Sequence, residues 1–217
     1  METRSPIRAV IFDYGGVLVR IADESPRQRL ADRYGVRLDT IYRLLFDSDS
    51  ARLAALGEIT TAKHWQTIAT LLKVPMPELP EFIHQFWSAD ALDMDLMAYI
   101  RRLRPGYKVG LLSNAFDDLR LMLVERWKIA ADFDNLIISA EVGLVKPDAR
   151  IYHLAVERLG VAADAAVFLD DVQQNMEGAR AAGLQAIWFR DPAAARRQLD
   201  TLLNESGPAQ AKPLDPA

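Results

Sequence analysis

The sequence predicts an α/β fold in which a doubly wound, mostly parallel sheet carries helices on both faces and a helical cap follows the first strand. Two observations support this fold. From residue 93 onward, short apolar runs of strand length alternate with segments of helical spacing. Between residues 21 and 92, by contrast, strand patterns are absent and helical spacing dominates.

The first strand is the apolar run Val10–Phe12, which contains the β-branched residues typical of a buried strand. It ends at Asp13. Gly15 and Gly16 then allow a sharp turn and a close approach of the backbone to a ligand. Open α/β sheets hold their chemistry at the carboxyl ends of their strands, so we expect Asp13 to be a functional residue.

The inserted segment is expected to hold four short helices. They are a helix over 27–34 that ends at Gly35, one capped by Asp39, one capped by Thr60 and one over 81–87. In the helix after Thr60, the side chains expected to point inward are Trp65, Ile68, Ala69 and Leu72. The segment is too long for a simple link between a strand and a helix, so we interpret it as a cap rather than a crossover connection.

The rest of the chain alternates strands and helices. Strands are expected at 107–112, 135–139, 165–169 and 185–189, and helices at 94–103, 117–127, 147–160, 174–182 and 192–203. The prediction therefore assigns residues 1–20 and 93–204 to an α/β core and residues 21–92 to the cap. Residues 205–217 are rich in proline, alanine and polar residues, and are predicted to be a disordered tail.

Charge and composition exclude several functions. The formal net charge of -4 argues against nucleic acid or an anionic membrane as a partner. The absence of cysteine excludes disulfides, thiolate nucleophiles and cysteine-based metal sites, and it fits a reducing compartment. No apolar run approaches membrane-spanning length, so the expected location is the cytoplasm.

Polar residues follow three of the predicted strands at the point where each strand ends. They are Asp13, the pair Ser113-Asn114 and the pair Asp170-Asp171, and Lys146 lies in the loop 143–147 after the short strand expected at 135–139. Parallel strands joined by right-handed crossovers bring such positions to one edge of the sheet. Taken singly, each is more often a turn residue, a helix cap or a solvated lysine. Their joint occurrence at successive strand ends favours a functional site.

The residue types of this set suit phosphoryl transfer. Three carboxylates close together repel one another, and a hard cation such as Mg²⁺ relieves the repulsion while it binds phosphate oxygens. Ser113 and the amide groups beside it can hold anionic oxygens, and Lys146 adds positive charge. Positioning and charge neutralisation are the main requirements of phosphoryl transfer.

Four segments resemble the motifs of the haloacid dehalogenase-like (HAD) hydrolase superfamily. They are FDYGGVL at 12–18, LLSN at 111–114, VKPDARIY at 145–152 and VFLDDVQQN at 167–175. The resemblance extends from about residue 7 to residue 203, and the inserted helices resemble the C1-type cap on the Rossmann-like core of that family. GEIT at 57–60 is similar to a branch that contains bacterial glucose-1-phosphate phosphatases and the N-terminal phosphatase domain of epoxide hydrolases.

This resemblance implies a phosphatase that forms an aspartyl-phosphate. Asp13 is the implied nucleophile and Lys146 the implied catalytic lysine, while Ser113 and Asn114 are the implied substrate-binding residues. The implied substrate is a small phosphorylated metabolite, with sugar phosphates among the candidates. The sequence predicts no particular oligomeric state.

The resemblance also implies Mg²⁺ as cofactor, held by Asp13, Asp170, Asp171 and the backbone carbonyl of Gly15. Most phosphatases of the superfamily carry an acid/base Asp at the position of Gly15. Such a group is typically worth about 10²–10⁴-fold in rate. Dehalogenases also lack that Asp, but they lack the acidic pair Asp170-Asp171 as well. Two alternatives follow from Gly15: a metal-independent 2-haloacid dehalogenase, or a catalytically weakened phospho-ligand-binding or regulatory protein.

Overall fold

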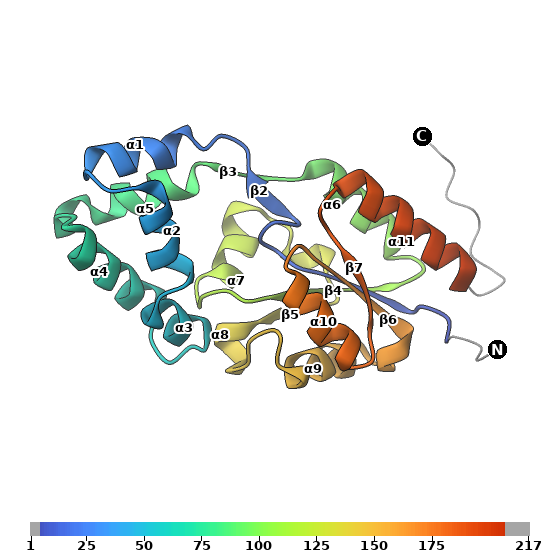
Figure 1. The fold of residues 1–217 in the computed structure, drawn as a ribbon. Helices are drawn as coiled ribbons and strands as arrows, with labels where there is room; N and C mark the ends of the chain where they lie inside the picture. Colours follow the sequence, from blue (N-terminus) through green and yellow to red (C-terminus); the bar gives the residue numbers. More distant parts are fainter. Residues whose placement is uncertain (1–4, 207–217) are drawn as a thin grey trace.

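A computed structural model describes residues 5–206 and shows one five-stranded parallel sheet (Figure 1). The strand order is β5-β4-β1-β6-β7. The strands are β1 (Ala9–Phe12), β4 (Lys108–Ser113), β5 (Asn135–Ile138), β6 (Ala166–Asp170) and β7 (Gln185–Trp188). The chain moves outward from β1 in one direction and then in the other, so the predicted doubly wound α/β fold is confirmed.

Strand β1 lies in the middle of the sheet, between β4 and β6. Phe12, its last residue, is in register with Leu111 of β4 and with Leu169 of β6. All four residues of β1 are fully buried. Its run is continuously apolar because both faces of the strand are covered by helices. The residues that follow β1, β4 and β6 therefore meet at one edge of the sheet.

Helices cover the two faces of this sheet (Figure 1). One face packs against α6 (Met94–Leu103), α11 (Pro192–Ser206) and the segment of α7 (Leu119–Leu121) with the π-helical turn Met122–Arg126. The other face packs against α9 (Ala149–Leu159) and α10 (Gln173–Ala181). Within β1, Val10 and Phe12 point to the first face, and Ala9 and Ile11 point to the second, as the two-residue period of a strand requires.

Five helices, one more than predicted, lie between β1 and α6. They are α1 (Ser25–Arg33), α2 (Leu38–Phe46), α3 (Asp49–Ala55), α4 (Thr61–Leu72) and α5 (Leu79–Trp87). The unpredicted helix α3 is short and is capped by Ser48, whose side chain accepts a hydrogen bond from the Ala51 amide. We call residues 21–92 the cap and the rest of the described chain the core.

The predicted helix caps differ in outcome. Thr60 caps α4 as predicted, since its hydroxyl accepts a hydrogen bond from the Lys63 amide. Asp39 was expected to cap the second helix, and this expectation is wrong. Helix α2 begins at Leu38, with Arg37 at the cap position, two residues before Asp39, and Asp39 lies inside the first turn. A carboxylate there is still favourable, because the helix N-terminus carries partial positive charge.

A short antiparallel pair that was not predicted joins the cap to the core. Strand β2 (Val19–Ile21) pairs with β3 (Asp90–Leu92), so the chain enters and leaves the cap side by side. Each strand has only three residues, which is too short for a periodic pattern to be visible in the sequence.

The cap has its own aromatic core. Trp65 lies 6.0 Å from Phe86 and 6.1 Å from Phe82 between ring centroids, and both pairs meet edge to face. Buried Arg27 donates to Asp90 of β3 at 2.7 Å and lies over the Phe86 ring. All four residues predicted to point inward from α4 are buried.

The C-terminal tail was expected to begin at residue 205. Helix α11 instead runs to Ser206, so the first two residues of that predicted tail are helical, and residues 207–217 lie outside the described part of the chain. Among residues 5–206, no helix has both the length and the apolar character needed to cross a membrane.

Candidate active site

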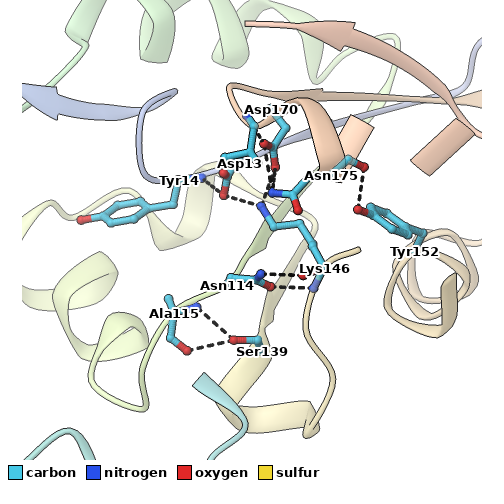
Figure 2. A network of polar contacts seen from close by, with 10 residues as sticks. Asp13, Tyr14, Asn114, Ala115, Ser139, Lys146, Tyr152, Asp170 and Asn175 are labelled. Carbon is cyan, nitrogen blue, oxygen red and sulfur yellow. Dashed lines mark hydrogen bonds and ion pairs between the residues drawn. The ribbon is translucent and has the colours of Figure 1, made fainter. Parts of the chain in front are cut away.

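Three of the predicted site residues meet in direct contact at the carboxyl edge of the sheet (Figure 2). The Lys146 ammonium lies 2.9 Å from Oδ1 of Asp13 and 2.6 Å from Oδ2 of Asp170. Asp13 directly follows β1, and Asp170 is the last residue of β6. Asp171 is the next residue and also offers a carboxylate oxygen to this group. The neighbouring positions of β1 and β6 thus bring together residues that are far apart in the sequence.

The contact is almost completely removed from solvent. The exposed fractions are 6% for Asp13, 4% for Lys146 and 0% for Asp170. Burial raises the pKa of Asp13 to about 7, although Lys146 acts in the opposite direction. Burial opposes the charge on Lys146, but Asp13 and Asp170 outweigh it and raise the pKa of Lys146. Lys146 is therefore an ammonium whose charge is shared by two carboxylates.

The donor set fits a hard divalent cation. Asp13, Asp170 and Asp171 each offer one carboxylate oxygen, and these oxygens lie within 4.8 Å of one another. Burial and the neighbouring Asp170 raise the pKa of Asp171, as expected for carboxylates that lack a counter-charge. One lysine cannot balance three acids, and oxygen ligands of this kind suit Mg²⁺.

The two glycines after Asp13 have different roles. At Gly16, φ is +75°, and a Cβ there would lie only 2.0 Å from Oδ2 of Asp171. Only glycine lets this turn and the Asp171 carboxylate approach so closely. At Gly15, an added Cβ would have no heavy atom within 4 Å. Steric crowding therefore does not require glycine at position 15, and the Gly15 carbonyl accepts no backbone hydrogen bond within residues 5–206.

Asn114 holds the main chain of Lys146. Its Nδ2 donates to the Lys146 carbonyl at 2.9 Å, and its Oδ1 accepts from the Lys146 amide at 2.7 Å (Figure 2). The sequence predicts a substrate-binding role for Asn114, but this geometry favours a role in positioning Lys146. Ser113, the last residue of β4, is buried at the same sheet edge.

Asn175 supports Asp170 through a contact that is not predicted from the sequence. Its Nδ2 lies 3.1 and 3.0 Å from the two carboxylate oxygens of Asp170, and its own carbonyl accepts a hydrogen bond from the Tyr152 hydroxyl at 2.6 Å (Figure 2). The Trp188 indole likewise donates to the Asp171 carbonyl at 2.8 Å. For the Asn175 contact, the only signal in the sequence is a polar residue in the first turn of the helix that follows the acidic pair. For the Trp188 contact, the sequence contains no signal.

Tyr14 follows Asp13, and its side chain points away from the site, because successive side chains of an extended segment alternate in direction (Figure 2). Its amide donates to Oδ1 of Asp13 at 2.7 Å. Its hydroxyl accepts a hydrogen bond from the Trp127 indole at 2.7 Å, and burial raises the pKa of Tyr14 to about 12. The backbone of Tyr14, and not its side chain, therefore contributes to the site.

Fold and site together define a doubly wound α/β enzyme. Its centre is an acid-rich site at the carboxyl edge of the sheet, with three carboxylates that could hold a metal ion. The family model described as haloacid dehalogenase-like hydrolase matches residues 7–183, and the chain belongs to this family.

Two curated relatives resemble this chain over different lengths. Phosphoserine phosphatase of Thermus thermophilus is 37% identical over 86 residues, which cover 39% of this chain and 34% of that protein. Bifunctional epoxide hydrolase 2 of Mus musculus is 29% identical over 229 residues, which cover 96% of this chain and 41% of that protein. The chain therefore spans less than half the length of each of these relatives.

Solved structures share the fold. A predicted HAD-like family hydrolase from Porphyromonas gingivalis has a TM-score of 0.71 at 21% identity, with coverage of 89% of this chain and 98% of that one. A HAD family enzyme from Bacteroides thetaiotaomicron, in complex with magnesium and inorganic phosphate, has a TM-score of 0.69 at 20% identity, with coverage of 84% and 93%. At these identities the similarity supports the fold alone.

Proposed function

We propose that this protein is a Mg²⁺-dependent phosphatase of a small phosphorylated metabolite and that it acts through an aspartyl-phosphate on Asp13. The observation that carries the proposal is the buried contact of Lys146 with Asp13 and Asp170 at the end of the central strand. The phosphatase relatives support this reading, as does the crystallised family member with magnesium and inorganic phosphate.

Asp13 is well placed to act as a nucleophile. Lys146 and the Tyr14 amide both bind Oδ1, which orients the carboxylate, and Oδ2 is the attacking oxygen in this proposal. In the first step Oδ2 forms a bond to phosphorus, the bond from phosphorus to the ester oxygen breaks, and the leaving group takes up a proton from water. In the second step a water attacks phosphorus, loses a proton, and releases phosphate and the Asp13 carboxylate.

The metal ligands in this proposal are Asp13, Asp170, Asp171 and the Gly15 carbonyl. Mg²⁺ bound there supplies positive charge that offsets the carboxylates and the transferring phosphoryl group. Asn175 and the Val172 amide keep Asp170 in place, since both donate to its carboxylate. Ser113 would bind phosphoryl oxygens from the end of β4, and the Lys146 ammonium would offset their negative charge.

The glycine at position 15 restricts which leaving groups the enzyme can release efficiently. A phosphatase without the usual acid/base residue works best on a leaving group that needs little protonation, such as an anomeric sugar oxygen. This argument keeps sugar phosphates among the candidate substrates. In this proposal, residues 1–20 and 93–204 form the catalytic core, and residues 21–92 act as a cap that excludes water and selects the substrate.

The direct test is turnover of a panel of phosphorylated metabolites with Mg²⁺, with and without EDTA, beside the variant Asp13→Asn. We expect phosphate release that EDTA abolishes and that Asp13→Asn loses. Turnover that survives in Asp13→Asn would reject the nucleophile assignment. Halide release from a 2-haloacid in EDTA would identify a dehalogenase, although buried Asp170 beside an anionic substrate argues against it. Tight phosphate binding without any turnover would identify a binding protein.

A further inference from the structure

The loop 114–118, which follows β4, is fixed firmly to the core at its start. Asn114 holds the Lys146 main chain through two hydrogen bonds. The buried Ser139 hydroxyl then accepts from the Ala115 amide and donates to the Ala115 carbonyl, both at 3.0 Å (Figure 2). The start of this loop is therefore tied to the same lysine that contacts Asp13 and Asp170.

The end of the same loop is fixed to the cap. Oδ1 of Asp117 accepts a hydrogen bond from the Thr61 amide at 3.0 Å and a second one from the Thr61 hydroxyl. Thr61 is buried and is the first residue of α4. Its amide is one of the donors that a helix leaves unpaired at its N-terminus, and the helix dipole adds to the attraction for a carboxylate.

Packing strengthens this connection between cap and core. Phe116 lies 5.0 Å from the His64 ring between centroids and packs against the aromatic core of the cap. Next to it, a Cβ on Gly57 would lie 2.1 Å from the Ala140 carbonyl, so the cap backbone lies directly on the core there. These contacts are on elements other than the β2–β3 pair, which forms the covalent link between cap and core.

We propose that the loop 114–118 couples the cap to the active site and that Asp117 is the positioning residue that holds helix α4 on the core. One end of the loop is held at Lys146 and the other end at the N-terminus of α4. A movement of the cap at α4 is therefore passed to Lys146, and a movement of Lys146 to the cap, through a loop of only five residues. This inference rests on the proposed function where it concerns substrate. When the Asp117 contact is lost, the cap spends less time on the core. The apparent affinity for substrate then falls in proportion to the fraction of molecules that still have the cap closed.

The test uses Asp117→Ala and Asp117→Asn, with Asp39→Ala as the matched control. Asp39 is also an acid in the first turn of a cap helix, but its one ion pair among residues 5–206 is with exposed Arg37. Thr61→Pro is a second variant that removes both donors to Asp117, since proline is well tolerated at the first position of a helix. Residue 60 already has the extended backbone that precedes proline.

Two measurements are made on each full-length variant. Hydrogen exchange at the first turn of α4 is followed with and without Mg²⁺ plus inorganic phosphate, and steady-state hydrolysis of p-nitrophenyl phosphate gives KM and kcat. In the wild type we expect the ligands to slow exchange at α4. In Asp117→Ala and Thr61→Pro we expect faster exchange, loss of this protection and a KM higher on the order of tenfold with kcat little changed. Asp117→Asn should retain part of the contact, and Asp39→Ala should match the wild type.

Unchanged α4 exchange in both Asp117→Ala and Thr61→Pro would overturn the proposal. A loss of kcat with unaltered KM would overturn it as well, because Asp117 would then act on the chemistry. If the wild type neither hydrolyses an ester nor binds phosphate, the proposed phosphatase function fails. The exchange comparison of the ligand-free proteins then decides alone whether Asp117 holds α4.

Discussion

At the scale of single residues, Lys146 offsets part of the negative charge of the site. It is buried between Asp13 and Asp170, with contacts of 2.9 and 2.6 Å. Removing one member of a buried ion pair leaves an uncompensated charge, which typically costs about 3–5 kcal/mol. The arrangement therefore depends on residues that keep each member oriented, namely Asn114 for Lys146 and Asn175 for Asp170.

The variant Asn175→Ala tests the support of Asp170. It removes both hydrogen bonds from Nδ2 to the carboxylate but leaves the metal ligands intact. Loss of such an outer partner typically lowers metal affinity about 10–100-fold. We expect the Mg²⁺ concentration for half-maximal activity to rise by that factor. Gln173→Ala is the matched control, because Gln173 lies exposed on the same helix and bonds only Glu177. An unchanged Mg²⁺ requirement in Asn175→Ala would show that Asp170 is held without it.

Gly15→Asp tests whether the missing acid/base limits the rate. The structure has room for the new side chain, since an added Cβ there meets no heavy atom within 4 Å. On esters with poor leaving groups we expect kcat to rise, up to about 10²-fold. Gly16→Asp is the contrasting variant, because its Cβ would collide with Asp171, and it should lose activity. A rate in Gly15→Asp that stays level would mean that another group already transfers the proton.

At the scale of elements, the cap depends on contacts between its helices. His64 of α4 is fully buried, with its Nδ1 at 2.9 Å from the Ser50 hydroxyl and its Nε2 at 3.0 Å from the Leu45 carbonyl. The side chain thus joins α4 to the end of α2 and the start of α3. Burial lowers the pKa of His64 below its ordinary value of 6.5, because the charged form loses its hydration.

The lowered pKa of His64 predicts a pH dependence of cap stability. The unfolded chain takes up a proton below pH 6.5 more readily than the folded chain, so this stabilisation is complete above that pH and is lost as pH falls below it. We expect the melting temperature of the wild type to fall more between about pH 7.5 and about pH 5.5 than that of His64→Gln. His153→Gln serves as control. Equal pH slopes in wild type and His64→Gln would contradict the assignment.

How far the sequence predicts an element depends on where its signal lies. The first strand, the Thr60 cap and the inward face of α4 could be predicted because propensity and periodicity act within a few residues. Helix α3 and the β2–β3 pair could not, because each is too short for a period and is stabilised by contacts with distant segments. Asp13, Lys146 and Asp170 could be predicted because each lies in a short segment that can be recognised in the sequence. Trp188 and Asp117 lie in no such segment, and only the fold brings them to their partners.

At the scale of the whole molecule, three carboxylates and one ammonium leave the site with excess negative charge. Mg²⁺ that binds only the folded chain should therefore stabilise it. At about 100 times its dissociation constant the gain is about 2.7 kcal/mol, which raises the melting temperature of a chain of this size by roughly 5 to 10 °C. Calorimetry with and without Mg²⁺ measures this shift. We expect Asp171→Asn to reduce it, and an equal shift in that variant would place the metal elsewhere.

The central claim is that Asp13 carries the phosphoryl group during turnover. The most direct measurement uses a phosphate ester that the enzyme is found to hydrolyse. The enzyme is quenched with acid during turnover of this ester with Mg²⁺, and its peptides are analysed by mass spectrometry. We predict one added phosphoryl group on the peptide that contains Asp13, which EDTA prevents and Asp13→Asn lacks. A phosphoryl group on another residue, or unimpaired turnover by Asp13→Asn, would contradict this account.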